Sequence, residues 1–378
     1  MPAKDNAFIA DPLDRDLLDR LQASIPCVER PFDAIGAALG LSGDDVIGRI
    51  RRLKEERVIR QISAIFDTRS LGYASSLVAA RIDPARVDEA AAIINRHPGV
   101  SHNYLRNHDF NLWYTIAVAP TSRLGLEATV QRLHELSGAG STRLLPTLRL
   151  FKIGVRFAMG DSSEPADTAG GGPASPHAGG GPAWPHAGGG DAPPAPAFSD
   201  KNRTKQESLT PFEIQFVRLM QRDLPLFSEP FVEAAYTLGI PFPRLRKTHE
   251  QFLQCGRMRR FAAVLHHRKA GFMANAMGVW AGPADDPAEL RRIGEIMAGF
   301  PAVSHCYQRP SYPDWPYNLF TMVHGRSEQD CEQVLDEIAF LTGITDRMAL
   351  YSSKEYKKVR VRYFTDDEAA WEETAWER

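Results

Sequence analysis

The apolar residues near the start of the chain have the spacing of amphipathic helices. They recur every three or four residues over positions 13–21 and again over positions 46–53. Ser42, with Asp45 three residues later, supplies the side chains that would cap the later helix. A short strand pattern follows. This order predicts a winged helix-turn-helix domain over residues 11–70.

Beyond this domain, segments with strand patterns and segments with helical spacing alternate. The strand patterns occupy residues 74–83, 100–105, 110–120 and 142–157, and the helical patterns occupy residues 84–99 and 123–138. The resulting order β-α-β-β-α-β is that of a ferredoxin-like domain, in which two helices cover one face of an antiparallel sheet. We therefore predict an α+β fold with such a domain over residues 71–158.

Both domains recur in the second half of the chain. Pro26 matches Pro225, Gly72 matches Gly271, and "KIGVRF" near the end of the first copy matches "KVRVRY" near the end of the second. An internal duplication predicts the same two domains again. The second winged helix-turn-helix would span residues 209–270 and the second ferredoxin-like domain residues 271–365. We call the two copies the first half and the second half, and we expect them to pack as a pseudo-heterodimer.

Two segments lie outside the repeats. Residues 159–208 are rich in Gly, Pro, Ala and Ser, and such a composition buries too little apolar surface to fold, so we predict a flexible linker. Residues 366–378 form an acidic tail that we expect to fray, with Trp371 and Trp376 as the groups that could dock.

Composition and charge point to a soluble protein of the cytoplasm. The chain of 378 residues has 43% hydrophobic residues, 24% charged residues and a formal net charge of −2. The sequence shows neither a signal peptide nor an apolar run long enough for a membrane span. Its four cysteines lack CxxC spacing, which argues against a disulfide framework and against a cysteine-ligated metal.

A DNA-binding role is the first function to weigh. Each half places six basic residues on and after the second helix of its helix-turn-helix, where phosphate contacts would use them. In the first half, acidic residues such as Asp44 and Glu55 are interleaved with them. In the second half, Pro241 and Pro243 stiffen the start of the helix that should enter the groove. We therefore expect no DNA partner.

A Ser-His-x-Tyr-x-Arg cluster occurs once in each half. His102, Tyr104 and Arg106 alternate along a predicted strand, so their side chains share one face. Arginine can hold a carboxylate in a bidentate fork, tyrosine offers a flat surface, and histidine can donate a proton or bind a metal. The second half repeats the cluster as His305, Tyr307 and Arg309. Recurrence of the whole cluster favours a shared pocket over a structural accident.

The two copies of the motif also differ. The first half adds His108, Asn111 and Trp113 around the following turn. The second half keeps Asn318, has Phe320 in place of Trp113, has no counterpart of His108, and inserts "PSYPDWP" at the turn. The pocket of the second half could therefore be different or inactive, and one half could bind the ligand while the other mainly completes the interface. The histidines outside the motif are interpreted as surface or structural residues: His134, His249, His266, His267 and His324.

The domain pair resembles that of the Lrp/AsnC-type regulators, in which the ferredoxin-like domain dimerises and senses a small molecule. The segment "RHPGVSHNYLRNHDFNLWYTIAV" is more specific, and it resembles the most characteristic segment of the siroheme decarboxylase family. The similarity covers both halves and leaves out the linker. It implies non-oxidative removal of two acetate carboxyl groups from siroheme, which gives 12,18-didecarboxysiroheme in heme d1 biosynthesis.

The resemblance also implies roles for particular residues. Arg106 and Arg309 would anchor carboxylates, together with Lys152 or Arg156 of the closing strand. The tyrosines, asparagines and tryptophan of the motif would complete the substrate contacts: Tyr104, Asn111, Trp113, Tyr307 and Asn318. The proton donor would be His102, His108 or His305, and His102 or His305 could instead be an axial ligand of the siroheme iron.

No cofactor is implied beyond the iron-containing siroheme substrate, and no metal held by the protein alone. The implied partners are siroheme, a homologous subunit of the G-H type, and further copies of the chain. Two alternatives remain: a tetrapyrrole-binding sensor without turnover, and a DNA-binding transcriptional regulator.

Overall fold

The computed structural model describes residues 11–153, 208–265 and 274–376. The predicted linker lies almost wholly outside the described residues, so its expected flexibility stays a prediction. Arg156 also lies outside them. Among the described helices, none is long and apolar enough to cross a membrane.

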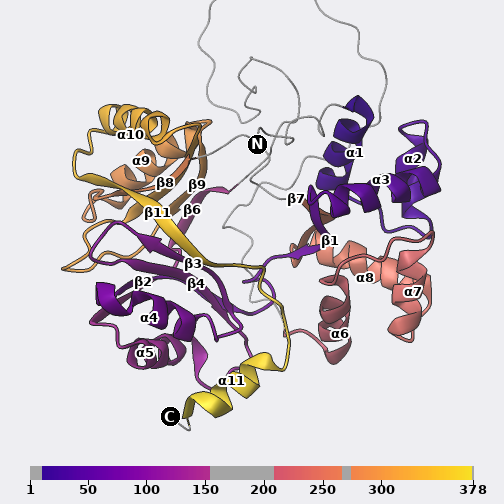
Figure 1. The fold of residues 1–378 in the computed structure, drawn as a ribbon, viewed down its shortest axis with the longest axis horizontal. Coiled ribbons are helices and arrows are strands. Elements are labelled where there is room, and N and C mark those ends of the chain that lie inside the picture. Colours follow the sequence, from indigo (N-terminus) through magenta and orange to yellow (C-terminus); the bar gives the residue numbers. More distant parts are fainter. Residues whose placement is uncertain (1–10, 154–207, 266–273, 377–378) are drawn as a thin grey trace, which may run out of the picture. The chain divides into compact units, whose positions relative to one another are not determined.

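Each half begins with a helix-turn-helix and a single wing strand (Figure 1). The elements are α1 (Pro12–Ala23), α2 (Pro31–Ala37), α3 (Gly43–Glu55) and β1 (Ile59–Phe66), and then α6 (Pro211–Met220), α7 (Pro230–Thr237), α8 (Phe242–Gln254) and β7 (Met258–Leu265). Ser42 and Asp45 form the predicted capping box of α3. The wings β1 and β7 pair antiparallel with each other. Each wing is therefore completed by the other half, and both domains share one apolar core.

The ferredoxin-like domains also exchange strands. The first half supplies β2 (Ala74–Arg81), β3 (Val100–Arg106), β4 (Leu112–Val118), β5 (Ser141–Leu145) and β6 (Arg149–Ile153), with helices α4 (Val87–Ile94) and α5 (Gly125–Ser137). The second supplies β8 (Ala274–Trp280), β9 (Val303–Gln308), β10 (Leu319–Gly325) and β11 (Arg347–Lys358), with helices α9 (Pro287–Gly299) and α10 (Glu328–Thr342). In the described residues the strand order is β5-β2-β4-β3-β11-β8-β10-β9-β6.

The closing strand of each half differs from the prediction of one continuous strand within one sheet. In the first half it is divided into β5, which pairs with β2, and β6, which pairs with β9 of the second half. In the second half, β11 stays continuous and pairs first with β8 and then with β3. The strands of the two halves thus form one nine-stranded sheet, and each closing strand pairs with the other half. This arrangement supports the expected pseudo-heterodimer.

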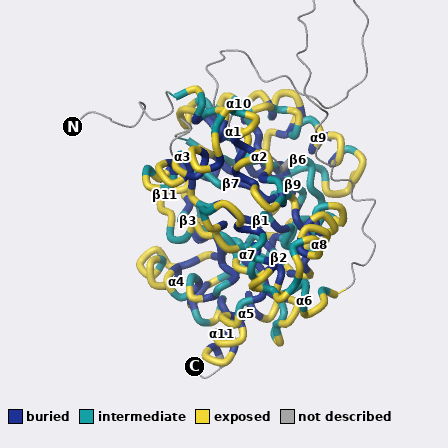
Figure 2. Tube along the Cα trace, turned by 90° about the vertical axis from the view of Figure 1, so that its right-hand side faces the viewer, coloured by how far each residue is buried: buried dark blue, intermediate teal, exposed yellow. Residues whose placement is uncertain are grey.

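Three further apolar clusters hold these layers together. In Figure 1, α4 and α5 lie side by side against the first-half strands, and α9 and α10 against the second-half strands. One cluster fills each of these helix–sheet layers. The third, which includes Trp113, Trp315 and Phe320, joins side chains of both halves. Figure 2 shows the strands largely buried and the outer faces of the helices exposed.

The inserted "PSYPDWP" of the second half packs onto the first half. Trp315 is 1% exposed, and its ring centroid lies 5.2 Å from that of Trp113 and 5.4 Å from that of His108. Arg143 of β5 holds the neighbouring Asp314 through two hydrogen bonds of 2.8 and 2.6 Å. The insert therefore covers the β3–β4 turn of the first half.

Replacing Trp315 by alanine is expected to lower the free energy of unfolding by about 3–5 kcal/mol, because it leaves a cavity among buried aromatic rings. Urea denaturation followed by circular dichroism measures the change. Tyr236→Ala is the control, since Tyr236 is 86% exposed and its loss should change the free energy by less than about 0.5 kcal/mol. Equal values for the two variants would show that the insert does not hold the halves together.

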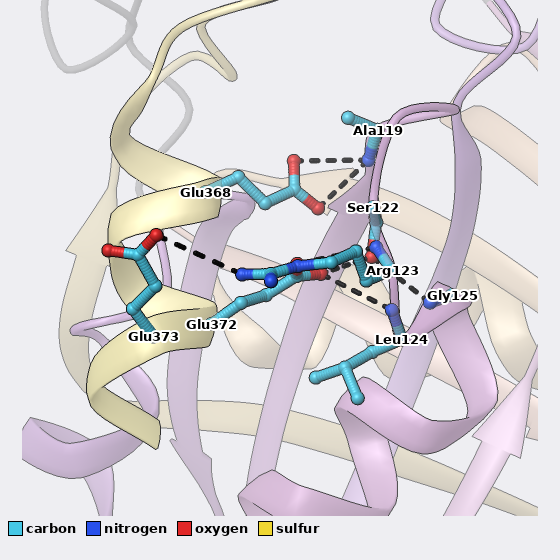
Figure 3. Close-up of polar contacts among 8 residues, drawn as sticks. All are labelled: Ala119, Ser122, Arg123, Leu124, Gly125, Glu368, Glu372 and Glu373. Carbon is cyan, nitrogen blue, oxygen red and sulfur yellow. Dashed lines mark hydrogen bonds and ion pairs between the residues drawn. The ribbon is translucent and has the colours of Figure 1, made fainter. Parts of the chain in front are cut away.

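The acidic tail is a docked helix, in contrast to the frayed segment expected from the sequence. Residues Asp367–Trp376 form α11, and Trp371 packs against His97 with ring centroids 4.5 Å apart. Figure 3 shows Glu368 and Glu372 reaching backbone N–H groups between β4 and α5. The predicted fraying is wrong because the acidic residues that suggested solvation are hydrogen-bond acceptors here, whereas the predicted docking of Trp371 is confirmed.

Candidate active site

Both motif histidines lie beside a β-bulge. The pairing of β3 with β4 shifts between Val100 and His102, and the pairing of β9 with β10 shifts at the equivalent place before His305. The extra residue of each bulge is the motif serine. A bulge changes the direction in which side chains point. Ser101 Oγ consequently lies 3.0 Å from His102 Nδ1, and Ser304 Oγ lies 2.8 Å from His305 Nδ1.

The tyrosine and arginine of each motif continue from the histidine, as the alternation predicted. The ring centroids of His102 and Tyr104 are 6.1 Å apart, and the guanidinium carbon of Arg106 lies 5.8 Å from the Tyr104 centroid. The second half repeats this with 6.0 Å between His305 and Tyr307 and 4.8 Å between Tyr307 and Arg309. Each half thus presents a row of His, Tyr and Arg.

Both arginines are buried and only partly satisfied. Arg106 Nη1 donates to the carbonyl oxygen of Leu350 at 2.6 Å, and Arg309 Nη1 donates to that of Leu145. Burial lowers the pKa of each guanidinium to about 10, so both stay charged near neutral pH. The Nε of each is buried and has no hydrogen-bond partner among the described residues. An unpaired buried donor is costly, and an anionic ligand would satisfy it.

The charges around the two motifs differ. Burial raises the pKa of Tyr307, while Arg309, Arg259 and Arg69 act in the opposite direction. Around Tyr104, burial and Glu355 raise the pKa to about 12, against Arg106. Three arginines therefore act on the second-half tyrosine and one on the first-half tyrosine, although Arg259 is also ion-paired with Asp67 at 2.7 Å. Positive charge of this kind suits a substrate with several carboxylates.

Four of the predicted substrate contacts are engaged elsewhere. The amide of Asn111 bonds the backbone of Ile82 at 3.0 and 2.8 Å, and the amide of Asn318 bonds that of Gly282 at 2.9 and 3.0 Å. Trp113 is 1% exposed and donates to the carbonyl of Phe110 at 2.6 Å. Lys152 donates to the carbonyl of Phe300 at 2.7 Å. These hydrogen bonds fix the positions of the four side chains, and their contacts with the substrate stay a prediction.

His108 and His102 have different neighbours. His108 Nδ1 accepts from the N–H of Phe110 at 2.9 Å, and its ring lies against Trp315 of the insert. Burial lowers its pKa. His102 instead contacts Ser101, Tyr104 and, at 3.4 Å, Thr115 Oγ1. The first half therefore offers one motif histidine beside Arg106, and His108 belongs to the covered turn.

Sequence reasoning missed Arg69, Arg259 and the two motif serines as parts of the site. Arg69 and Arg259 come from the winged helix-turn-helix region and its exit, so only tertiary structure brings them near Tyr307. The serines belong to the motif, but strand alternation alone places them on the face opposite to the histidines. The bulge that turns them toward the histidines leaves no periodic signal in the sequence.

The basic residues of α3 are occupied within the protein. Arg49 Nη1 lies 2.6 Å from Asp14 Oδ1, Arg51 donates to the carbonyl of Leu226 at 2.8 Å, and Lys54 Nζ lies 2.7 Å from Asp223 Oδ2. Contacts with DNA phosphates would require these interactions to break. No group of three or more described His, Cys, Asp or Glu residues is arranged to hold a metal ion.

Fold and site together define a duplicated AsnC-like protein with a helix-turn-helix. The family of the AsnC-like ligand binding domain matches residues 70–152 and 269–357. The family of the siroheme decarboxylase NirDL-like HTH domain matches residues 14–60.

Individual relatives make the assignment specific. The siroheme decarboxylase of Hydrogenobacter thermophilus is 34% identical over 94% of this chain and 96% of that protein. The crystal structure of siroheme decarboxylase NirDL in complex with an iron-uroporphyrin III analogue has a TM-score of 0.72 at 29% identity, and the match covers 97% of this chain and 99% of that one. The chain belongs to the siroheme decarboxylase family.

Some family members consist of separate subunits. The siroheme decarboxylase beta subunit of Methanosarcina barkeri is 43% identical over 150 residues, which are 40% of this chain and 97% of that protein. The chain described here instead carries two related halves in one polypeptide.

Proposed function

We propose that this chain is a siroheme decarboxylase, a carboxy-lyase that removes two acetate carboxyl groups from siroheme and yields 12,18-didecarboxysiroheme for heme d1 biosynthesis. The observation that carries the proposal is the pair of buried arginines, Arg106 and Arg309, each with an unpaired Nε beside a tyrosine and a histidine. Family membership and the iron-uroporphyrin analogue bound by the NirDL relative support it.

The chemistry needs no oxidant. The bond between the acetate methylene and its carboxylate breaks, carbon dioxide leaves, and the electron pair delocalises into the adjoining pyrrole. A proton then adds to the methylene carbon and makes a methyl group. The protein must bind the remaining carboxylates, exclude water and supply that proton, and a positioned general acid typically contributes about 10²–10⁴-fold to the rate.

We assign the reaction to the second-half motif. Arg309, with its unpaired Nε, would hold a carboxylate of siroheme. Arg259 and Arg69 act on Tyr307 as further positive charges, while Arg259 stays paired with Asp67 and Arg69 donates to the carbonyl of Thr147. His305 presents Nε2, because its Nδ1 is bound to Ser304. The first-half motif, with Arg106, would bind the substrate's remaining carboxylates or complete the fold. We expect no cofactor beyond the iron of siroheme, a cytoplasmic location, and a homologous subunit as a further partner.

Anaerobic incubation of the purified chain with siroheme, followed by mass spectrometry of the extracted tetrapyrrole, tests the proposal. The expected result is the loss of two carbon dioxide units. A His102→Ala/His305→Ala double variant is the negative control. An unchanged mass with a shifted Soret band would contradict the decarboxylase activity and indicate a sensor that binds the tetrapyrrole without turnover. An unchanged spectrum would overturn tetrapyrrole binding altogether.

A further inference from the structure

Ser304 links two histidines of the second half. Its Oγ lies 2.8 Å from His305 Nδ1 and 2.7 Å from His324 Nε2, and a longer contact of 3.3 Å reaches the carbonyl oxygen of Met322. His324 belongs to β10, the strand that pairs with β9. The bulge at Ser304 makes this arrangement possible, because it turns the hydroxyl toward the side chain of the next residue.

A hydroxyl between two imidazole nitrogens can pass a proton from one ring to the other. It carries one proton and can accept two hydrogen bonds, so it receives a proton from one nitrogen while it gives its own to the second. The Nε2 of His305 has no hydrogen-bond partner among the described residues. The chain of contacts therefore leads from His324 through Ser304 to the nitrogen that we assign to the substrate.

The first half lacks this connection. Ser101 Oγ lies 3.0 Å from His102 Nδ1, but its other neighbour is Thr115 Oγ1 at 2.7 Å. In the first half, His102 pairs with Thr115 of β4, and the residue two positions after Thr115 is Ala117. In the second half, His305 pairs with Met322 of β10, and the residue two positions after Met322 is His324. Through Ser101, the first-half contacts thus lead to the Thr115 hydroxyl, which is a poor proton source at neutral pH.

We propose that His324, Ser304 and His305 form a proton relay that delivers the proton replacing carbon dioxide on the substrate's acetate carbon. The proposal rests on the proposed function. His305 Nε2–H protonates the methylene carbon, the Ser304 hydroxyl gives its proton to His305 Nδ1, and His324 Nε2–H restores the serine proton. His324 takes up one proton from solvent. When the product leaves, His305 Nε2 takes a proton from water that enters the emptied site, and the Nδ1 proton returns through Ser304 and His324 to solvent, which restores the starting tautomers.

The environment of His305 explains why a relay is needed. Burial, with His324 and Arg259 nearby, lowers the pKa of His305 to about 4, so its imidazolium form is scarce near neutral pH. In the relay, His305 stays neutral and only changes tautomer. Burial and Lys358 lower the pKa of His324 too, and transient protonation of this half-buried ring is sufficient. His324 acts through His305, so it is a positioning and proton-supplying residue.

The test compares wild type, His324→Ala and His324→Gln in single-turnover decarboxylation of siroheme, with binding measured separately by Soret titration. His324→Ala should reduce the rate roughly 10–100-fold, within the range of general acid catalysis, and leave the Kd for siroheme within about two-fold. His324→Gln should be equally slow, because its amide can hydrogen-bond Ser304 but cannot pass on a proton. Added imidazole should restore activity to His324→Ala.

The control is His134→Ala, which removes a histidine on α5 bonded to Thr142 and should keep the wild-type rate. Wild-type activity in either His324→Ala or His324→Gln would overturn the relay and leave the decarboxylase intact. A wild type that binds siroheme without changing its mass would overturn the proposed function, and the relay with it.

Discussion

Replacing His305 by alanine is expected to lower kcat for siroheme decarboxylation by about 10²–10⁴-fold, the usual contribution of a positioned general acid. The reason is that its Nδ1 is hydrogen-bonded to Ser304 while its ring lies 6.0 Å from that of Tyr307, which is next to Arg309. The affinity for siroheme should change little, since the carboxylates are held by guanidinium groups. Single-turnover kinetics with mass analysis of the tetrapyrrole measures the rate, and Soret titration measures the affinity.

His102→Ala is the matched control, because His102 occupies the same position beside the bulge of the first half. Among the described residues, its contacts through Ser101 and Thr115 reach no second histidine, and Tyr104 has Glu355 as well as Arg106 near it, where Tyr307 has three arginines. We expect a rate loss of less than about ten-fold. A larger loss for His102→Ala than for His305→Ala would assign the reaction to the first half.

His305 could instead coordinate the iron of siroheme through the same Nε2. The two roles give different spectra. If His305 is the proton donor, the Soret and visible bands of bound siroheme should be nearly the same in His305→Ala as in wild type. A shift to the spectrum of siroheme without an imidazole ligand would identify the residue as the axial ligand.

The sequence predicted the elements of this fold better than the connections between them. Apolar spacing located the helices and strands, and the matched prolines and glycines revealed the duplication, because both signals are local. The sequence did not predict that β6 and β11 pair with strands of the other half, because the residue pattern of a strand does not indicate which strand it pairs with. The burial of Trp315 against Trp113 was missed for the same reason.

In the candidate site, too, the sequence predicted local features and did not predict contacts between distant segments. Alternation placed His, Tyr and Arg on one face, and the structure confirms these rows in both halves. The bulge serines, His324 on the neighbouring strand and Arg259 on β7 complete the second-half site through pairing and packing. His324 was interpreted as a surface or structural residue because it lies outside the motif in sequence. It lies next to the motif across the β9–β10 pair.

The helix α11 caps the N-terminus of α5, whereas the N-terminus of α10 is capped by residues of its own segment. The N-cap residue of α5, Leu124, has no side-chain cap, whereas α10 begins with a capping box of Ser327 and Asp330. Glu372 of α11 instead accepts from Ser122 Oγ at 2.5 Å and from the N–H groups of Arg123 and Leu124 at 3.3 and 3.4 Å (Figure 3). A carboxylate at this end also interacts favourably with the helix dipole.

Truncation after residue 366 is therefore expected to destabilise the first half. It removes the cap, the two bonds from the N–H of Ala119 to Glu368, and the packing of Trp371. Loss of a buried tryptophan together with several hydrogen bonds should cost roughly 4–8 kcal/mol, a large share of the stability of a typical domain. Chemical denaturation followed by circular dichroism measures the change.

Hydrogen exchange of the truncated chain can separate this local role from a general loss of stability. Amide exchange in α5 should accelerate strongly under native conditions, while exchange in α10 should stay close to that of the full chain, because α10 keeps its own capping box. Glu372→Ala should reproduce part of the effect at α5. Glu373→Ala is its control, since the Glu373 side chain is 72% exposed and lies 4.0 Å from Arg123. Equal acceleration in α5 and α10 would mean that α11 stabilises the protein as a whole and does not specifically cap α5.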